Sequence, residues 1–248
     1  MKKILFIIMI QILSFSAFAE NEIDLANDAY SKGNYNEAIE LYNKVLEKNG
    51  ESAEIYYNLG NAYYKENKTA NAILYYERAL LLDPSDADIR FNLELAKQKS
   101  VDKIVPVGEF FISSWFRALK QSANAESWSL IGVACYILLL ICAAVFLFNN
   151  KILLRKISFY SAIVFIVIVI VANIFAADQT DQLQNRSAAI VFAPTVTVKS
   201  SPDNSGNDLF LLHEGTKVMV KSKLGSWYEI QLEDGNIGWI PKDKIEII

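Results

Sequence analysis

Residues 128–148 read WSLIGVACYILLLICAAVFLF, and residues 157–177 read ISFYSAIVFIVIVIVANIFAA. Neither stretch holds a charged side chain. In an α-helix, which rises about 1.5 Å per residue, each run would extend about 30 Å, the thickness of the hydrocarbon core of a bilayer. The sequence therefore predicts two transmembrane helices and places the chain among multi-domain membrane proteins.

The segment between the two spans, residues 149–156, holds three basic and no acidic side chains. A segment this short can only turn the chain, so the spans form a hairpin. Cytoplasmic loops carry an excess of Lys and Arg, and the basic turn is therefore expected in the cytoplasm. Arg117, Lys120 and Arg186 flank the outer ends of the spans, so the orientation depends more on the N-terminus than on the loop charges.

The N-terminus has the pattern of a secretory signal peptide. Lys2 and Lys3 precede an apolar run over residues 4–13, and Ala17-Phe18-Ala19 supplies the small residues of a cleavage site. We expect residues 1–19 to be removed after Ala19, and an uncleaved anchor is the alternative. Export of this end predicts a two-pass protein of the bacterial inner membrane, with its N-terminal and C-terminal domains in the periplasm.

Residues 107–122 predict an amphipathic helix just before the first span. At about 100° per residue, the polar residues Glu109, Ser113 and Lys120 fall on one side of the helix. The apolar residues on the other side are Val107, Phe110, Phe111, Ile112, Trp115, Phe116, Ala118 and Leu119. One interpretation is an interfacial helix on the membrane surface; the other is a helix packed on the preceding domain, since the same stripe suits either burial.

Farther towards the N-terminus, two segments of the chain repeat each other. Residues 35–42 read YNEAIELY and residues 69–76 read TANAILYY, so Ala-Ile followed by Tyr occurs at the same place in both. The two copies are separated by a period of about 34 residues, which is typical of stacked helical hairpins. Gly60 and Ala72 would let paired helices approach closely, and Asp83-Pro84 would stop the second helix.

The spacing of the second copy resembles the tetratricopeptide repeat. The matching positions are Tyr56, Leu59, Gly60, Tyr63, Ala72, Tyr76, Ala79 and Pro84. Leu93 marks the start of a third copy, so we expect residues 20–100 to form two repeats and a capping helix. Because a short stack needs a further cover, the interfacial helix or a partner would complete it.

The resemblance implies a groove that binds extended peptides or helices of partner proteins and is lined by the first helix of each repeat. By that resemblance, the candidate partner-binding residues are Tyr57, Asn58, Asn61 and Tyr64. The alternative for each of them is ordinary helix surface.

After the second span we expect a polar linker over residues 178–187 and then an all-β module over residues 188–248. Val196-Thr197-Val198 alternates as a strand does, and Glu214-Gly215 and Asp234-Gly235 supply turns. The order of Gly225-Ser226-Trp227-Tyr228 and Gly238-Trp239-Ile240 resembles the bacterial SH3-like domain, which implies a small β-barrel.

Two tryptophans of this module have two possible roles. Trp227 and Trp239 would form a ligand platform for a peptide or a glycan strand if they are exposed. The alternative is that they fill the core, because a barrel of about sixty residues needs its large side chains inside.

The composition argues against several classes of function. The net charge of −4 gives no basic surface for nucleic acid. Cys135 and Cys142 both lie in the first span, away from any soluble site. The single histidine, His213, has no Gly-x-Ser-x-Gly partner and is interpreted as a turn residue. We therefore expect no enzymatic activity, no metal site and no cofactor.

Taken together, the order of signal peptide, helical repeats, two-helix hairpin and SH3-like domain resembles the BatE-type aerotolerance proteins. The resemblance implies an inner-membrane scaffold that works with other Bat components, among them von Willebrand A-domain membrane proteins and a MoxR-type ATPase, in oxygen or envelope stress tolerance. The alternative is a cell-wall sensor whose SH3-like domain binds peptidoglycan.

Overall fold

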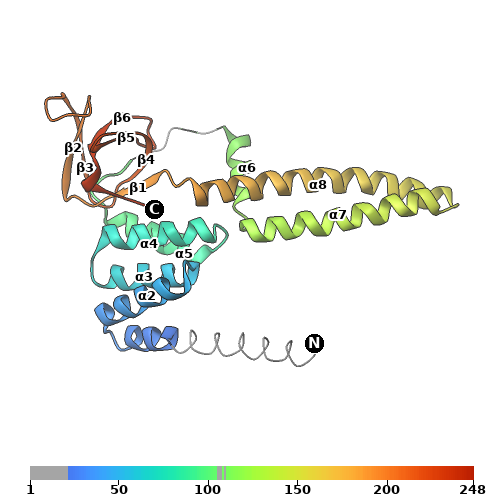
Figure 1. Cartoon of the computed structure of the whole chain (residues 1–248), viewed down its shortest axis with the longest axis horizontal. Helices are drawn as coiled ribbons and strands as arrows, with labels where there is room; N and C mark the ends of the chain where they lie inside the picture. The colour runs from blue at the N-terminus through green and yellow to red at the C-terminus, as the bar shows by residue number, and fades with distance from the viewer. Residues whose placement is uncertain (1–21, 105–107, 109) are drawn as a thin grey trace. The chain divides into compact units, whose positions relative to one another are not determined.

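The computed structural model describes residues 22–104, 108 and 110–248, and the expected signal peptide lies outside these residues. The chain forms two compact units. The first comprises the residues up to Leu82, Asp86–Gly108 and Ser187–Ile248, and the second comprises Asp83–Ser85 and Glu109–Arg186. In Figure 1 the blue and cyan helices and the red strands belong to the first unit, and the green and yellow helices belong to the second.

The N-terminal part of the first unit, here called the repeat module (residues 22–100), is a stack of antiparallel helices. A helix over residues 22–31 is followed by α2 (Tyr35–Asn49), α3 (Ala53–Lys65), α4 (Thr69–Leu82) and α5 (Ala87–Lys99). The Ser52 side chain accepts a hydrogen bond from the amide of Ile55, and Asp86 accepts from the amides of Asp88 and Ile89. These caps satisfy amides that have no partner within the helix.

Small residues let the helices of the repeat module pack closely. A Cβ atom at Gly60 would lie 2.6 Å from the ring of Tyr76, so only glycine allows this approach of α3 to α4. Ala72 on α4 is fully buried in the core of the repeat module. The prediction that Gly60 permits close packing is therefore confirmed, and α4 ends just before Asp83-Pro84, as expected.

The C-terminal part of the first unit, here called the β module (residues 188–248), is a seven-stranded antiparallel sheet. Its strands are β1 (Ala188–Val191), β2 (Thr195–Lys199), β3 (Asp208–His213), β4 (Lys217–Leu224), β5 (Trp227–Gln231), β6 (Ile237–Pro241) and β7 (Ile245–Ile247). They pair in the order β3-β2-β6-β5-β4-β1-β7, and a 3-10 turn, Lys242–Lys244, precedes β7.

The two modules of the first unit share a hydrophobic core. Ile190 on β1 is fully buried and belongs to the core of the repeat module, whereas its neighbours Ala189 and Val191 belong to the core of the sheet. Ile248 also packs into the helical core. Because β1 is buried on both faces, it reads as a continuous apolar run rather than an alternating one. We expected the interfacial helix or a partner to complete the short stack; here the β module packs on α4.

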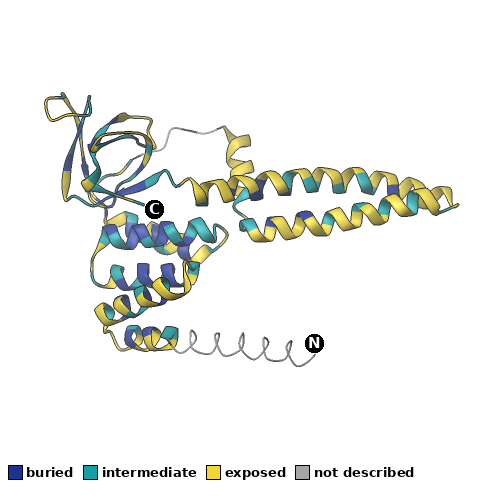
Figure 2. Ribbon diagram, in the orientation of Figure 1, coloured by how far each residue is buried: buried dark blue, intermediate teal, exposed yellow. Residues whose placement is uncertain are grey.

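The second unit is a helical hairpin preceded by a short helix. It consists of α6 (Phe111–Lys120), α7 (Ala125–Phe148) and α8 (Ile152–Gln184). The expected amphipathic helix is observed as α6, and its first expected residues, Val107 and Glu109, lie outside the part of the chain that the structure describes. Both α7 and α8 are long and apolar enough to cross a membrane, with mean hydropathies of 2.9 and 2.6 in their most apolar windows. Most of their apolar residues are exposed, as the yellow colour of both helices in Figure 2 shows, and this is expected of helices surrounded by lipid.

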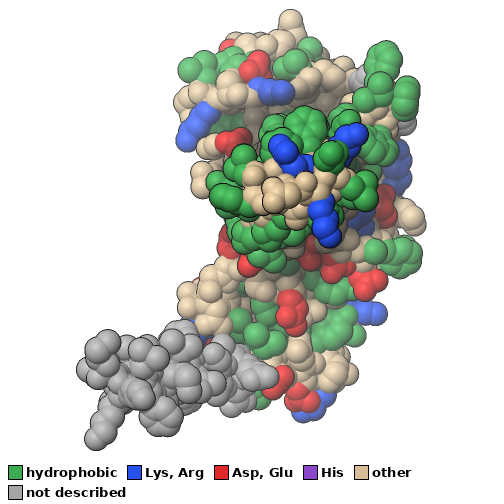
Figure 3. Space-filling view, turned by 90° about the vertical axis from the view of Figure 1, so that its right-hand side faces the viewer, with side chains coloured by type: hydrophobic (Ala, Val, Ile, Leu, Met, Phe, Trp, Pro, Cys, Tyr) green, Lys and Arg blue, Asp and Glu red, His purple; other side chains and the backbone are tan. Residues whose placement is uncertain are grey.

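The hairpin differs from the expected boundaries at both ends of α8. This helix begins at Ile152, so only residues 149–151 join it to α7, and it continues to Gln184 through most of the expected linker, 178–187. The extension has no Gly or Pro to stop it, and Gln182 donates a hydrogen bond to Asp178 across one turn. At the far end of the hairpin, basic side chains lie among apolar ones (Figure 3).

Candidate functional site

A pair of equivalent hydrogen bonds marks one face of the repeat module. The hydroxyl of Tyr42 on α2 donates to Oδ1 of Asn27 at 2.6 Å. The hydroxyl of Tyr76 on α4 donates to Oδ1 of Asn61 on α3 at 2.7 Å. Tyr76 follows Tyr42, and Asn61 follows Asn27, by the same repeat period, so each repeat holds its two helices together by the same bond.

Asn92 on α5 extends this face by bonding to two residues of α3. Its side-chain amide donates to the hydroxyl of Tyr57 at 2.9 Å and to Oδ1 of Asn61 at 3.0 Å. The rings of Tyr57 and Tyr76 have centroids 6.0 Å apart. Two of the four candidate residues from the sequence, Tyr57 and Asn61, therefore belong to one hydrogen-bonded cluster with Tyr76 and Asn92, which we call the Tyr-Asn cluster.

The other two candidates lie on the same helix but outside the cluster. Asn58 is half-buried on α3. Tyr64 is also half-buried, and the Nζ atom of Lys99 lies 3.7 Å from the centroid of its ring, a cation–π contact. Sequence reasoning missed Asn92, although the repeat pattern could have found it, because Asn92 follows Asn58 by one repeat period.

Tyr42 and Tyr76 are held as neutral hydrogen-bond donors. Burial raises the pKa of Tyr42 to about 12. Burial also raises the pKa of Tyr76 far above its ordinary value, with a smaller contribution from the neighbouring ring of Tyr57. Both hydroxyls therefore keep their protons at any physiological pH, and the bonds to Asn27 and Asn61 persist.

In the β module, Trp227 and Trp239 lie on the outer face of the sheet. Ile230 on β5 and Ile240 on β6 are fully buried. Since side chains alternate along a strand, the half-buried Trp239 points away from this core, and Trp227, an odd number of residues from Ile230, does the same. Trp239 pairs with Glu229 and Trp227 pairs with Pro241, so the two rings occupy a diagonal of one surface.

Asp102 links the end of the repeat module to the β module. Its Oδ2 atom accepts hydrogen bonds from the amide of His213 at 2.7 Å and from the hydroxyl of Thr216 at 2.6 Å, and its Oδ1 lies 2.7 Å from Nδ1 of His213. Burial raises the pKa of Asp102, but the hydrogen bonds from Thr216 and His213 outweigh it and leave the pKa below its ordinary value. His213 ends strand β3 and is the first residue of the following turn, in which the amide of Thr216 donates to its carbonyl at 3.4 Å. Beyond the turn role expected from the sequence, its side chain also contacts Asp102.

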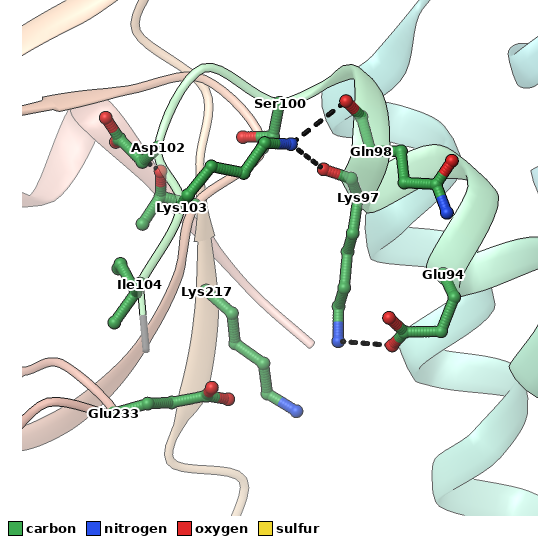
Figure 4. Close-up of a pocket in the computed structure, with 11 residues that line it drawn as sticks. Glu94, Lys97, Gln98, Ser100, Asp102, Lys103, Ile104, Lys217 and Glu233 are labelled. Carbon is green, nitrogen blue, oxygen red and sulfur yellow. Dashed lines mark hydrogen bonds and ion pairs between the residues drawn. The ribbon is translucent and has the colours of Figure 1, made fainter. Parts of the chain in front are cut away.

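A second link between the modules centres on Glu77 of α4. This carboxylate is almost completely buried and lies 2.6 Å from Nζ of Lys217 on β4 and 3.2 Å from Nζ of Lys97 on α5. Burial raises the pKa of Glu77, but the two ammonium groups outweigh it and lower the pKa below its ordinary value. Beside this link lies a pocket of about 390 Å³ (Figure 4), in which Lys103 donates to the carbonyls of Lys97 and Gln98.

Comparison with known families matches both modules. Residues 23–88 match the tetratricopeptide repeat, and residues 194–246 match the bacterial SH3 domain. The chain carries tetratricopeptide repeats and a bacterial SH3 domain. The repeat match ends at residue 88, just after α5 begins, and the SH3 match starts just before β2, so β1 lies outside it.

Comparison with solved structures gives similarity to the Yersinia enterocolitica type III secretion chaperone SycD in complex with a peptide of the translocator YopD. The identity is 12%, over 62% of this chain and 92% of the chaperone, with a TM-score of 0.31, which is too low to support an argument. Comparison with curated protein sequences gives no significant match.

Within residues 22–104, 108 and 110–248, no three His, Cys, Asp or Glu side chains lie close enough together to hold a metal ion.

Proposed function

We propose that this protein is a non-enzymatic, membrane-anchored scaffold whose tetratricopeptide repeats bind protein partners. The observation that carries the proposal is the Tyr-Asn cluster beside Asn58 and Tyr64. Oδ1 of Asn61 already accepts bonds from Tyr76 and Asn92, so the group it can offer a ligand is its amide N–H. A rigid donor among aromatic rings suits the backbone carbonyls of an extended partner segment.

The shared core of the first unit supports a common compartment for both modules. The segments that build this unit lie before and after the hairpin in the sequence, yet Ile190 and Ile248 pack into the core of the repeats. Two segments that pack together must lie on the same side of any membrane that α7 and α8 cross. The turn between these helices would then lie on the opposite side, and its basic residues favour the cytoplasm for it.

We place this scaffold in the periplasm, anchored in the bacterial inner membrane, as part of a Bat-type complex for oxygen or envelope stress tolerance. The supporting observations are the export signal in the sequence and the order of the modules along the chain. The partners would be other membrane proteins of that complex, in particular those with von Willebrand A domains.

Crosslinking in cells tests the partner-binding role. A photo-reactive phenylalanine derivative at position 64 should capture a von Willebrand A-domain membrane protein. Recovery of that partner from detergent-solubilised membranes should fall about tenfold for Asn58→Ala, as expected for a loss of about 1.4 kcal/mol.

The matched control for this experiment is Asn49→Ala, because Asn49 is exposed at the end of α2 and outside the candidate surface. The control should bind as the unchanged protein does. Equal recovery with Asn58→Ala and Asn49→Ala would remove this surface from the proposal.

A second candidate function is the binding of peptidoglycan by the SH3 domain. The observation that favours it is the position of Trp227 and Trp239 on one outer surface of the sheet, each only half-buried. Aromatic rings with Glu229 beside them can contact both the sugar faces and the peptide amides of a cell-wall strand.

Retention of the full chain on purified sacculi tests this second function. Trp227→Ala combined with Trp239→Ala should abolish retention, whereas Leu211→Ala, at an exposed position of β3, should not. Retention that is absent for the unchanged protein, or equal in all three proteins, would reject a cell-wall ligand.

A further inference from the structure

Most of the apolar face of helix α6 is exposed among the residues that the structure describes, and only Leu119 at its C-terminal end packs on the hairpin. None of its ten residues is buried. Phe111 and Trp115 are 77% and 60% exposed, and the neighbouring Phe110 is 83% exposed. Exposed aromatic side chains gathered on one face of a helix mark an interaction site.

The C-terminal end of α6 is fixed to the hairpin by four polar contacts. The carbonyl of Lys120 accepts hydrogen bonds from Nε1 of Trp128 at 2.9 Å and from the amide of Gln179 at 2.8 Å. Gln179, which is 7% exposed, also donates to the carbonyl of Ala123 at 3.0 Å. Nζ of Lys120 forms an ion pair with Asp178. These bonds satisfy carbonyls at the end of the helix and hold α6 against the outer end of α8.

The contacts with α8 also fix which way the apolar face of α6 points. Leu119, near the centre of that face, packs against the cluster that joins Trp128 of α7 to Phe175 of α8, where the apolar part of α8 ends. Lys120, on the opposite side of α6, contacts Asp178, where α8 becomes polar. Since the two positions on α8 are about 4.5 Å apart along the helix axis, the apolar face of α6 lies towards the apolar part of the hairpin.

The direction of α6 agrees with this arrangement. In Figure 1, α6 runs across the direction of α7 and α8 rather than alongside them. A helix that crosses two membrane-spanning helices at the end of their apolar segments, with its aromatic face towards those segments, has the geometry of an interfacial helix.

We propose that α6 lies in the boundary between the headgroups and acyl chains of the bilayer that holds the hairpin, with Phe111, Trp115 and Phe116 among the acyl chains. The partner of this face is lipid. The contacts of Gln179, Trp128 and Asp178 set the depth of the helix. The inference assumes that α7 and α8 span a membrane, as in the proposed function, but it does not depend on any protein partner.

Spin labels on the full chain test this proposal. In a Cys135→Ala, Cys142→Ala background, a label is attached at Trp115→Cys, at Ser113→Cys on the polar side of α6, or at Leu140→Cys in α7. The protein is reconstituted into vesicles of phosphatidylethanolamine and phosphatidylglycerol. Collision rates with oxygen, which concentrates in lipid, and with a water-soluble nickel chelate report the surroundings of each label.

The expected result is a label at position 115 that lies about 5–10 Å below the lipid phosphates, and a label at position 113 in water. A label at position 115 in water, or one shielded from both reagents by protein, would overturn the proposal. Phe111→Cys repeats the measurement if Trp115 proves necessary for folding. The label at position 140 distinguishes failure of this proposal from failure of the proposed function. If α6 is not in the interface but the label at position 140 lies in lipid, only the interfacial helix is rejected. If the label at position 140 does not lie in lipid, the membrane-spanning hairpin is rejected as well.

Discussion

Glu77→Ala is expected to loosen the contact between the repeat module and the β module. The Glu77 side chain is 7% exposed and contacts Lys217 at 2.6 Å and Lys97 at 3.2 Å. Removing one partner from a buried ion pair costs about 3–5 kcal/mol. The two lysines are 28% and 34% exposed and can turn towards water, so the lower end of that range applies, about 3 kcal/mol. This corresponds to a roughly hundredfold increase in the fraction of molecules in which the repeat module and the β module are separated.

The rate of thiol labelling at position 100 measures this population. Ser100 is 9% exposed at the contact, and its hydroxyl donates to the carbonyl of Glu214. In a chain with Ser100→Cys and without its native cysteines, Glu77→Ala should speed maleimide labelling roughly hundredfold. The matched control is Glu94→Ala, because Glu94 is 68% exposed and 3.7 Å from Lys97, a pair worth at most about 1 kcal/mol. If the thiol at position 100 is labelled equally fast in both variants, the ion pair does not hold the modules together.

Three further predictions concern pH, packing and the position of α6. The pKa values of Glu77 and Asp102 lie below their ordinary values in the folded protein. The two carboxylates therefore stabilise the contact between the modules fully above about pH 5, and this stabilisation is lost as pH falls through the folded pKa values. Labelling of the introduced thiol at position 100, corrected for thiol reactivity, should accelerate only below about pH 4. Constant labelling down to about pH 3 would contradict this. Gly60→Ala should destabilise the helices by about 1–3 kcal/mol, because its Cβ would lie 2.6 Å from the Tyr76 ring; an unchanged thermal transition in far-UV circular dichroism would show that the ring can move aside. Gln179→Ala removes one bond to the last residue of α6 and one to Ala123 in the segment that follows, and should increase the mobility of a spin label at position 115. An unchanged spectrum would mean that the other contacts suffice.

The helical repeats could be predicted from the sequence because their determinants are local. The recurrence of Ala38 at Ala72 and of Tyr42 at Tyr76 reports a period of helix pairs, and Gly60 reports the close approach within one pair. The two apolar helices could be predicted equally well, since length and hydropathy are properties of a single continuous segment.

The contact between the modules could not be predicted because it joins residues far apart in the chain. The ion pair of Glu77 with Lys217 spans 140 residues, and the bond of Asp102 to His213 spans 111. No periodicity connects such positions. The apolar run in β1 was a usable signal, since a strand buried on both faces needs a second layer, but the sequence does not say which layer covers Ile190.

The candidate site was predicted in part. Tyr57 and Asn61 lie in one cluster, as the repeat pattern places them on one helix face, but Asn92 comes from α5, where only Leu93 had been matched to the repeat. For Trp227 and Trp239, strand alternation predicts two faces without saying which is inside. The buried positions of Ile230 and Ile240 decide it.

The shared core of Ile73, Ile190 and Ile248 has a consequence for the biogenesis of this protein. In a chain whose hairpin crosses a membrane, the repeats are synthesised well before the last strand, which returns to their side of the membrane only after two crossings. Until then the outer side of α4 has no cover. A ribosome that stalls within the final strands would leave this surface open, and proteases would recognise the unfinished molecule by it.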